Sequence, residues 1–472
     1  MAMESCSSET LLLIILFAVL SLSTLAHWNA KPTLPLPPGP PAEFILGHAR
    51  VVPKENAAAV YAKWSKEYSD HREDSDVVHV RSLGRSTVVL NSAEAARDIL
   101  DKKGANFCDR PRFPLLEVIV WDGTTFSNTN VRQWHNLQMN EARTTVRNIL
   151  KRPEAWETSL RRLAVAIVLQ VSYGTQVPED DDPYIQIAND AMYATGNGGV
   201  PANSIVDLVP LVRYLPDWLV RDWPLRFARQ WRWAIKKLHD VPFAAAQAEH
   251  TRFDPRADSG PQGKNEHHNN TSLAHQLLRQ YKDNESLGRD QEWSLDDIKG
   301  AAGAVFIAGA DTTWATCVIF ILNMVLHPEI QEKARSQLDA VLGPDRLPNF
   351  SDRPCLPYIE HIVQEIYRTV VYANSYAIAH DERVYHAPQD FNPDRYEAGE
   401  PFPVGNFGFG RRVCVGRFLA DNSVWIMVAT MLATLEFQKK TASDGTPIEP
   451  RVRFTNGGTW IGTPDHDLVR LD

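Results

Sequence analysis

The sequence has few cysteines, and the five that it has do not suggest pairs. They are odd in number and widely spaced, which excludes a disulfide scaffold or a Cys-x-x-Cys zinc site and favours a reducing compartment. An excess of positive charge is missing too, since 49 lysine and arginine residues stand against 58 acidic residues and the basic ones are scattered. We therefore predict no nucleic-acid partner. The cysteines are Cys6, Cys108, Cys317, Cys355 and Cys414.

The chain also lacks internal repeats and low-complexity bias. Apolar residues make up 44% and charged residues 23%, a balance that excludes a disordered or collagenous chain. No period recurs, so solenoids and propellers are excluded. The 472 residues are enough for a large core, and one enzyme fold can be this long.

One apolar run stands near the N-terminus. Residues 10–26 are uncharged and just long enough to span a bilayer, and residues 27–43 are rich in proline. We predict a lumenal segment at 1–9, a transmembrane signal anchor at 10–26, a hinge at 27–43 and one catalytic domain at 44–472. A removed signal peptide is the alternative, but the run has no lysine or arginine before it. Lys31 behind the run favours a cytosolic catalytic domain.

Periodicity beyond the hinge is mostly helical. Residues 78–92 alternate apolar and polar side chains and predict a β-hairpin. A capping box of Ser294 and Asp297 begins a helix that continues to Leu326, roughly 50 Å at 1.5 Å per residue. Pro328 begins the next helix. Polar residues within the long helix make a second transmembrane span improbable, so a buried core helix is expected.

The long helix carries the first chemical motif. Small residues at 308–310 precede Asp311 and Thr312. Such residues would let a flat ligand lie against the backbone, and a carboxylate beside a hydroxyl could relay protons. Close helix packing is the alternative explanation for the small residues.

An acidic and a basic residue form the second motif. Glu365 and Arg368 are three residues apart on a helix, so they share a face and predict an ion pair. Arg395 lies in a later turn.

The third motif is the loop 407–416, with the sequence FGFGRRVCVG, before an apolar helix. It brings Cys414 to the helix N-terminus, where the dipole and free N–H groups stabilise a thiolate. Gly410 and Gly416 would permit a tight turn and the approach of a planar cofactor, and Arg412 could neutralise an acidic group on it. A thiolate can be an axial haem ligand. A buried structural cysteine is the alternative.

With these three motifs in this order, the chain resembles the cytochrome P450 family, specifically membrane-anchored fungal members of the eukaryotic type. The resemblance implies a mainly α fold with small β-sheets. It implies haem b as cofactor, with Cys414 as the thiolate ligand to iron. It further implies that Phe407 shields the sulfur, that Arg412 pairs with a haem propionate, and that Asp311 and Thr312 deliver protons to bound O2.

The resemblance also implies a reaction and partners. We expect a monooxygenase of fungal secondary metabolism that inserts one oxygen atom from O2 into a small apolar molecule. NADPH-cytochrome P450 reductase would donate electrons at the endoplasmic reticulum membrane, with the catalytic domain in the cytosol. Glu365, Arg368 and Arg395 would form the family's structural ion-pair triad.

Two departures from the family suggest internal deletions. The family's Trp-x-x-x-Arg helix is incomplete, and Arg132 is the remaining candidate for a propionate partner. Only 22 residues, 369–390, separate Arg368 from Phe391, where the family's strands and turns need roughly 40. A skipped exon, a wrong splice junction or a decayed gene would explain this. The alternative function is therefore a catalytically impaired or non-catalytic haem protein.

Overall fold

A computed structural model describes most of the chain. The described residues are 35–44, 46–53, 57–68, 76–82, 85–107, 109, 131–198, 204–252, 272–369, 375–450, 453–454, 462–463 and 469–471. The predicted lumenal segment, the anchor at 10–26 and the first part of the hinge lie outside these residues.

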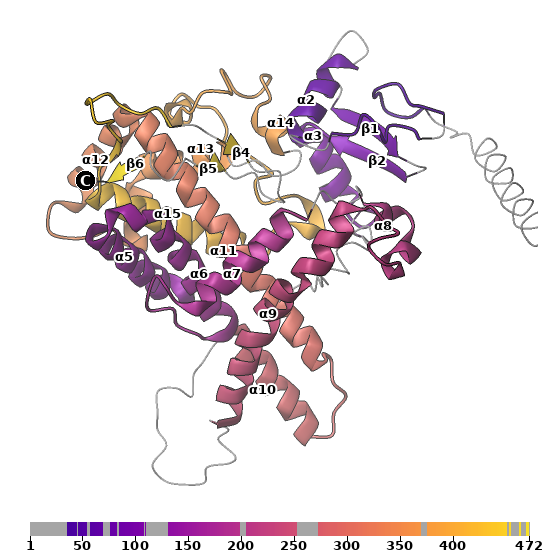
Figure 1. The fold of residues 1–472 in the computed structure, drawn as a ribbon. Helices are drawn as coiled ribbons and strands as arrows, with labels where there is room; N and C mark the ends of the chain where they lie inside the picture. The colour runs from indigo at the N-terminus through magenta and orange to yellow at the C-terminus, as the bar shows by residue number, and fades with distance from the viewer. Residues whose placement is uncertain are drawn as a thin grey trace, which may run out of the picture.

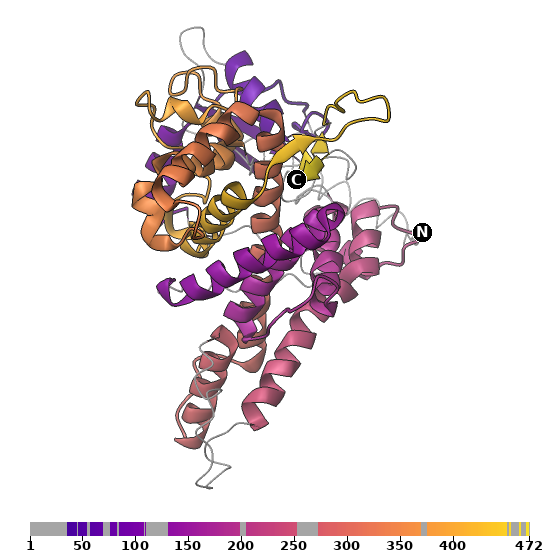
Figure 2. The ribbon, with the colours of Figure 1, turned by 90° about the vertical axis from the view of Figure 1, so that its left-hand side faces the viewer.

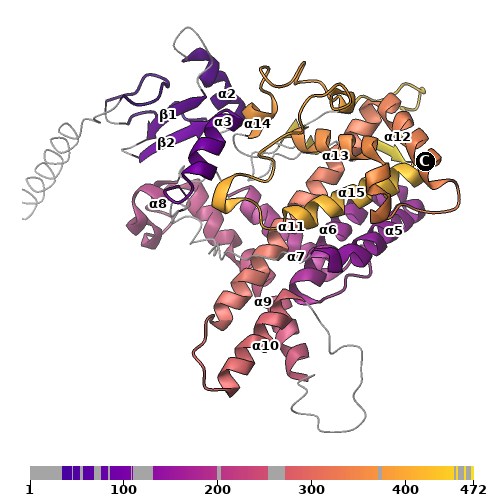
Figure 3. The same ribbon diagram turned by 180° about the vertical axis from the view of Figure 1, so that it is seen from behind.

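The N-terminal part contains the predicted hairpin. Strand β1 (Val77–Ser82) pairs antiparallel with β2 (Arg85–Leu90), with Val78 opposite Val89. The helix α2 (Ala57–Glu67) covers this hairpin through Trp64, which packs in one cluster with the buried valines of both strands. The hairpin prediction is confirmed, and Figures 1 and 3 show this unit on the same side of the molecule as α8.

Helices make up the rest of the body, and small two-stranded sheets complete it. After β2 come α3 (Ala93–Ala96), η1 (Arg97–Lys102), η2 (Arg132–Trp134), α5 (His135–Lys151), η3 (Pro153–Ala155), α6 (Trp156–Tyr173), α7 (Pro183–Gly196), α8 (Ile205–Leu208), η4 (Pro210–Tyr214), α9 (Trp223–Arg252), α10 (Leu273–Ser286), α11 (Leu295–Leu326), α12 (Pro328–Leu342), η6 (Phe350–Cys355), α13 (Pro357–Thr369), α14 (Ser375–Ala379), η7 (Pro393–Arg395), η8 (Gly410–Arg412), α15 (Arg417–Thr434), β3 (Phe437–Lys439), β4 (Arg453–Phe454), β5 (Gly462–Thr463) and β6 (Val469–Leu471). Strand β3 pairs with β6 and β4 with β5, both antiparallel. The predicted class, mainly α with small sheets, is confirmed.

The long helix α11 crosses the body (Figure 1). Ser294 Oγ accepts a hydrogen bond from the Asp297 N–H at 3.1 Å, and the Asp297 carboxylate accepts one from the Ser294 N–H at 2.9 Å, so the predicted capping box is present. α12 begins at Pro328 as expected. Length and apolar composition would let α11 span a membrane, but 72% of its most apolar window is buried, as for a core helix. Figure 2 shows α9, α10 and the first turns of α11 projecting together from the body.

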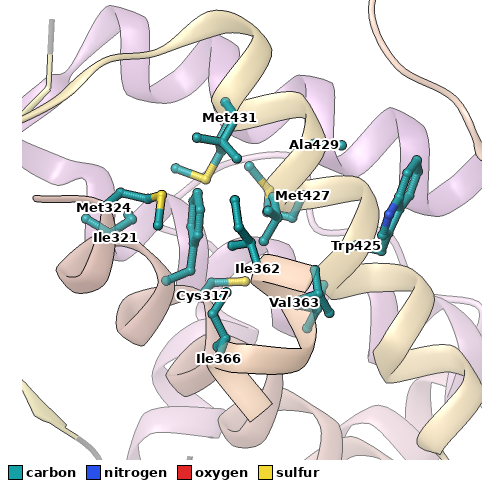
Figure 4. Close-up of a cluster of buried hydrophobic side chains, with 14 of the residues drawn as sticks. Cys317, Ile321, Met324, Ile362, Val363, Ile366, Trp425, Met427, Ala429 and Met431 are labelled. Atoms are coloured by element: carbon teal, nitrogen blue, oxygen red, sulfur yellow. The ribbon is translucent and has the colours of Figure 1, made fainter. Parts of the chain in front are cut away.

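The main core joins α11, α13 and α15. Figure 4 shows Cys317 of α11, Ile362 of α13, and Trp425 and Met427 of α15 in one cluster. All four side chains are fully buried. A second cluster joins α6, α7, α9 and the first half of α11. The second half of α11 therefore packs against α13 and α15.

The short interval after Arg368 forms no strand in its described residues. The segment 375–391 contains α14 and then turns. This agrees with the expectation that too few residues remain here for the family's sheet.

Candidate functional site

A glycine-rich loop positions Cys414 at the start of α15. Gly405, Gly408 and Gly410 have φ values of 85°, 81° and 66°, a left-handed conformation that favours glycine. The Cys414 N–H donates to the Phe407 carbonyl at 2.7 Å, which closes the loop. The Cys414 side chain is exposed, so the alternative of a buried structural cysteine is wrong.

Two opposed effects act on the Cys414 thiol. Neighbouring atoms desolvate it and raise its pKa, while the N–H groups of Gly416 and Arg417 and the charge of Arg417 lower the pKa. The net direction is upward. The helix N-terminus thus acts as the sequence predicts, but it is outweighed by desolvation. Binding to a metal ion deprotonates a thiol directly.

The long helix α11, otherwise largely buried, leaves a stripe of small residues accessible. Ala304, Ala308 and Thr312 recur every four residues, and Ala308 is exposed while the other two are half-buried. Residues four apart share a helix face. The Thr312 hydroxyl donates to the Ala308 carbonyl at 2.9 Å. α11 packs against α15, so the stripe and the cysteine loop belong to adjoining elements.

Two glycines of α11, Gly303 and Gly309, serve helix packing. A Cβ on Gly309 would collide with Val168 of α6, and one on Gly303 would lie 2.6 Å from His239 Nδ1 of α9. Close packing, the alternative considered above, therefore explains Gly309. The alanines, not the glycine, form the accessible stripe.

Asp311 pairs with a residue that the sequence motifs do not include. Its carboxylate lies 3.4 Å from the guanidinium of Arg161 on α6. That guanidinium also covers the ring of Trp314, 3.3 Å from its centre, and burial lowers the Arg161 pKa. Asp311 and Arg161 are 150 residues apart, so no local sequence pattern reveals the pair.

The other predicted site residues lie around the cysteine loop or before α5. The Phe407 ring is half-buried and contacts Tyr367 edge-on, with centres 5.3 Å apart. Arg412 is exposed in η8, and Arg132 is exposed in η2.

The two predicted site glycines differ in what requires them. Gly410 packs so closely on the Leu100 carbonyl that a Cβ would collide with it, so the chain's own packing requires glycine there. Gly416 has an ordinary φ of −80°.

The predicted ion-pair triad is formed. Glu365 is fully buried and lies 2.5 Å from Arg368 and 3.3 Å from Arg395. The Tyr396 hydroxyl donates to the same carboxylate at 2.7 Å. The triad links α13 to η7.

A second charged cluster supports α15 and was missed by the sequence analysis. Arg353 lies 2.8 Å from both Asp421 and Glu360, and the Tyr367 hydroxyl donates to Asp421 at 3.2 Å. Burial raises the Asp421 pKa. The only signal in the sequence was an acidic residue on an apolar helix, seven positions after Cys414.

These residues fit a flat metal cofactor with one thiolate ligand. A Cβ on Gly416 would meet only Cys414 Sγ, at 4.0 Å, so the surface beside the sulfur is open among the described residues. The accessible alanines of α11 leave room for a planar group as well. Within the described ranges, three or more His, Cys, Asp or Glu side chains do not gather as a metal site. The fold and this site define a protein of the haem-thiolate class.

Comparison with known proteins agrees with this class. The family model described as Cytochrome P450 matches residues 156–370 and 369–458. The chain belongs to the cytochrome P450 family, and its cofactor is haem held by a cysteine thiolate. The two matched segments overlap at residues 369–370, directly after Arg368, where the interval to Phe391 is short.

Similar proteins come from fungi. The chain is 31% identical to cytochrome P450 monooxygenase 98 of Postia placenta, over 92% of this chain and 89% of that protein. It is 31% identical to cytochrome P450 monooxygenase claT of Ampulloclitocybe clavipes, over 95% and 92%, and 29% identical to cytochrome P450 monooxygenase ple1 of Rhodocybe pseudopiperita, over 90% and 88%. The claT alignment spans 495 positions, more than the 472 residues here, so parts of that relative have no counterpart in this chain.

Proposed function

We propose that this chain is a haem-thiolate monooxygenase that inserts one oxygen atom from O2 into a small apolar molecule of fungal secondary metabolism. The observation that carries the proposal is the exposed Cys414 in its glycine loop, at the start of a helix that packs against α11. Family membership and relatives named as monooxygenases support the same reaction.

Cys414 would hold the haem iron. When bound, the haem would supply the site for O2 activation, and electron donation from the thiolate would favour O–O cleavage. The glycine loop fixes the cysteine backbone through the bond to the Phe407 carbonyl, and the Phe407 ring would shield the sulfur from water. Gly416 leaves the sulfur side open to the cofactor, and Gly410 lets η8 pack on η1. Arg412, with Arg132 as a second candidate, would pair with the propionates.

Thr312 and Asp311 would deliver protons. The Thr312 hydroxyl belongs to the accessible stripe of α11 and can accept or donate a proton there. The adjacent Asp311 is held by Arg161, so its carboxylate can supply the hydroxyl only by turning away from this partner or through water.

We also infer the partners and the location. NADPH-cytochrome P450 reductase would donate the electrons, and residues 10–26 would anchor the chain in the endoplasmic reticulum membrane with the catalytic domain in the cytosol. The alternative, a non-catalytic haem protein, is not favoured, because relatives that align over 90–95% of this chain are named as monooxygenases. The short interval after Arg368 would then affect how tightly the chain binds haem rather than which reaction it catalyses.

The experiment is the reduced CO spectrum of the full chain and two cysteine variants. Cys414→Ser should lose the red-shifted Soret band that a thiolate ligand gives. Cys355→Ser is the matched control, since it also removes an exposed cysteine, and it should keep the band. A Cys414→Ser protein that retains the band, or a Cys355→Ser protein that loses it, would refute the assignment. Turnover with reductase and NADPH then tests the reaction itself.

A further inference from the structure

Arg417, the first residue of α15, has an unusual set of partners. Its guanidinium donates to the Cys414 carbonyl at 3.0 Å and covers the exposed Phe418 ring at 4.3 Å. Its own N–H also points to that carbonyl, at 3.4 Å. Among the residues that the structure describes, no carboxylate pairs with Arg417.

This position is electrostatically unfavourable for a cation. The N-terminus of a helix carries partial positive charge, so acidic residues are favoured in the first turn and basic ones are not. The first turn of α15 has no acidic residue, and Gly416 provides no side-chain cap. Asp421, in the second turn, is held by Arg353. No acidic side chain in the described part of the helix start offsets the charge of Arg417.

Local rules are broken in this way where a function requires it. A cysteine thiolate is the anion that the proposed function puts next to Arg417, three residues away. The hydrogen bond from the Arg417 guanidinium to the Cys414 carbonyl, at 3.0 Å, places a positive charge against the residue that carries the sulfur. The same hydrogen bond also restrains the backbone of Cys414.

We propose that Arg417 is a positioning residue for the haem ligand: it holds the peptide of Cys414 and adds positive charge to the surroundings of its sulfur. The inference rests on the proposed function, because it requires Cys414 to be the ligand. The added charge stabilises the reduced cofactor, which carries one positive charge less than the oxidised one. Arg417 therefore makes the reduction potential more positive and keeps the ligand attached on reduction.

Three variants of the full chain separate this role from a structural one. Arg417→Gln removes the charge and keeps a hydrogen-bond donor, whereas Arg417→Lys keeps the charge. Arg411→Gln is the matched control, because Arg411 is exposed and lies three residues before Cys414, as Arg417 lies three after it. Redox titration with chemical mediators avoids any effect of these variants on reductase binding. Haem content and the reduced CO spectrum are measured on the same samples.

We expect Arg417→Gln to shift the potential to more negative values and to reduce the fraction of CO complex with the red-shifted band. Arg417→Lys should restore the potential toward that of the parent chain, and Arg411→Gln should leave both readouts nearly unchanged. The inference is wrong if Arg417→Gln matches Arg411→Gln, or if Lys and Gln lose haem equally without a shift in potential. Cys414→Ser distinguishes the two levels: if it keeps the red-shifted band, the proposed function fails first, and with it this inference.

Discussion

The buried carboxylate of Glu365 offers the sharpest test of how this fold is held together. It accepts hydrogen bonds from Arg368, Arg395, Tyr396 and the backbone N–H of Asn392, and its side chain is inaccessible to water. Glu365→Gln keeps the shape but removes the charge and turns an N–H₂ group toward these donors. Breaking a buried ion pair costs about 3–5 kcal/mol because the partner charge stays buried.

The partners decide where in that range the cost falls. Arg395 retains the carboxylate of Glu400 at 2.8 Å, whereas Arg368 retains backbone carbonyls and the Tyr385 ring but no carboxylate among its described partners. One arginine rather than two is left unpaired, so we expect a loss of about 3 kcal/mol, a large share of a typical net stability of about 5–15 kcal/mol.

Urea unfolding followed by tryptophan fluorescence measures this loss, since Trp425 lies in the core. Glu382→Gln is the control: it breaks an exposed pair with Lys66, 3.0 Å apart, and should cost about 0–1 kcal/mol. If Glu365→Gln costs no more than this control, the triad does not hold α13 to η7 and the reasoning is refuted.

Three further outcomes are expected. Thr312→Ala should keep haem but divert electrons from NADPH to peroxide, and unchanged coupling of NADPH use to product would contradict this. A chain lengthened between Arg368 and Phe391 to the roughly 40 residues that the family's strands and turns need should take up more haem than the chain as it stands, because unsatisfied buried backbone groups cost roughly 1–3 kcal/mol each. Equal stoichiometry and turnover would contradict the deletion argument. Stability should fall as the pH drops below about 6.5, since burial lowers the pKa of several histidines. The folded chain keeps them neutral while the unfolded chain binds protons. Their contribution to stability is therefore present above that pH and is lost as the pH falls through the folded-state pKa values. A urea midpoint that is constant from about pH 7.5 to about pH 5.5, one unit either side of 6.5, would refute this. These histidines are His79, His135, His239, His275, His361 and His380.

Features decided by neighbouring residues were predictable from the sequence. The start of α11 at Ser294, the start of α12 at Pro328 and the β1–β2 hairpin each depend on local chemistry, namely a capping box, a proline and an alternating pattern. The ion pair of Glu365 and Arg368 follows from helical spacing.

Features that depend on residues distant in the sequence were not predictable from the sequence. Arg161 reaches Asp311 from another helix, and Arg353 reaches Asp421 across 68 positions of chain, so no spacing rule could pair them. The small residues before Asp311 fitted both a ligand and a packed helix, and only the position of Val168 assigns Gly309 to packing. For Cys414, the dipole argument gave one contribution to the pKa, but desolvation depends on the whole fold.

Gly303 and Gly309, two of the three glycines of α11, fix how this helix is rotated about its axis. At about 100° per residue, Gly303 and Gly309 face directions about 120° apart, and the stripe of Ala304, Ala308 and Thr312 occupies the wide arc between them. His239 from α9 and Val168 from α6 enter these two positions. The direction in which the stripe faces is thus set by side chains that do not belong to it. Substitutions on α6 or α9 can therefore rotate α11 and change the direction in which Thr312 faces, without altering a residue of the stripe.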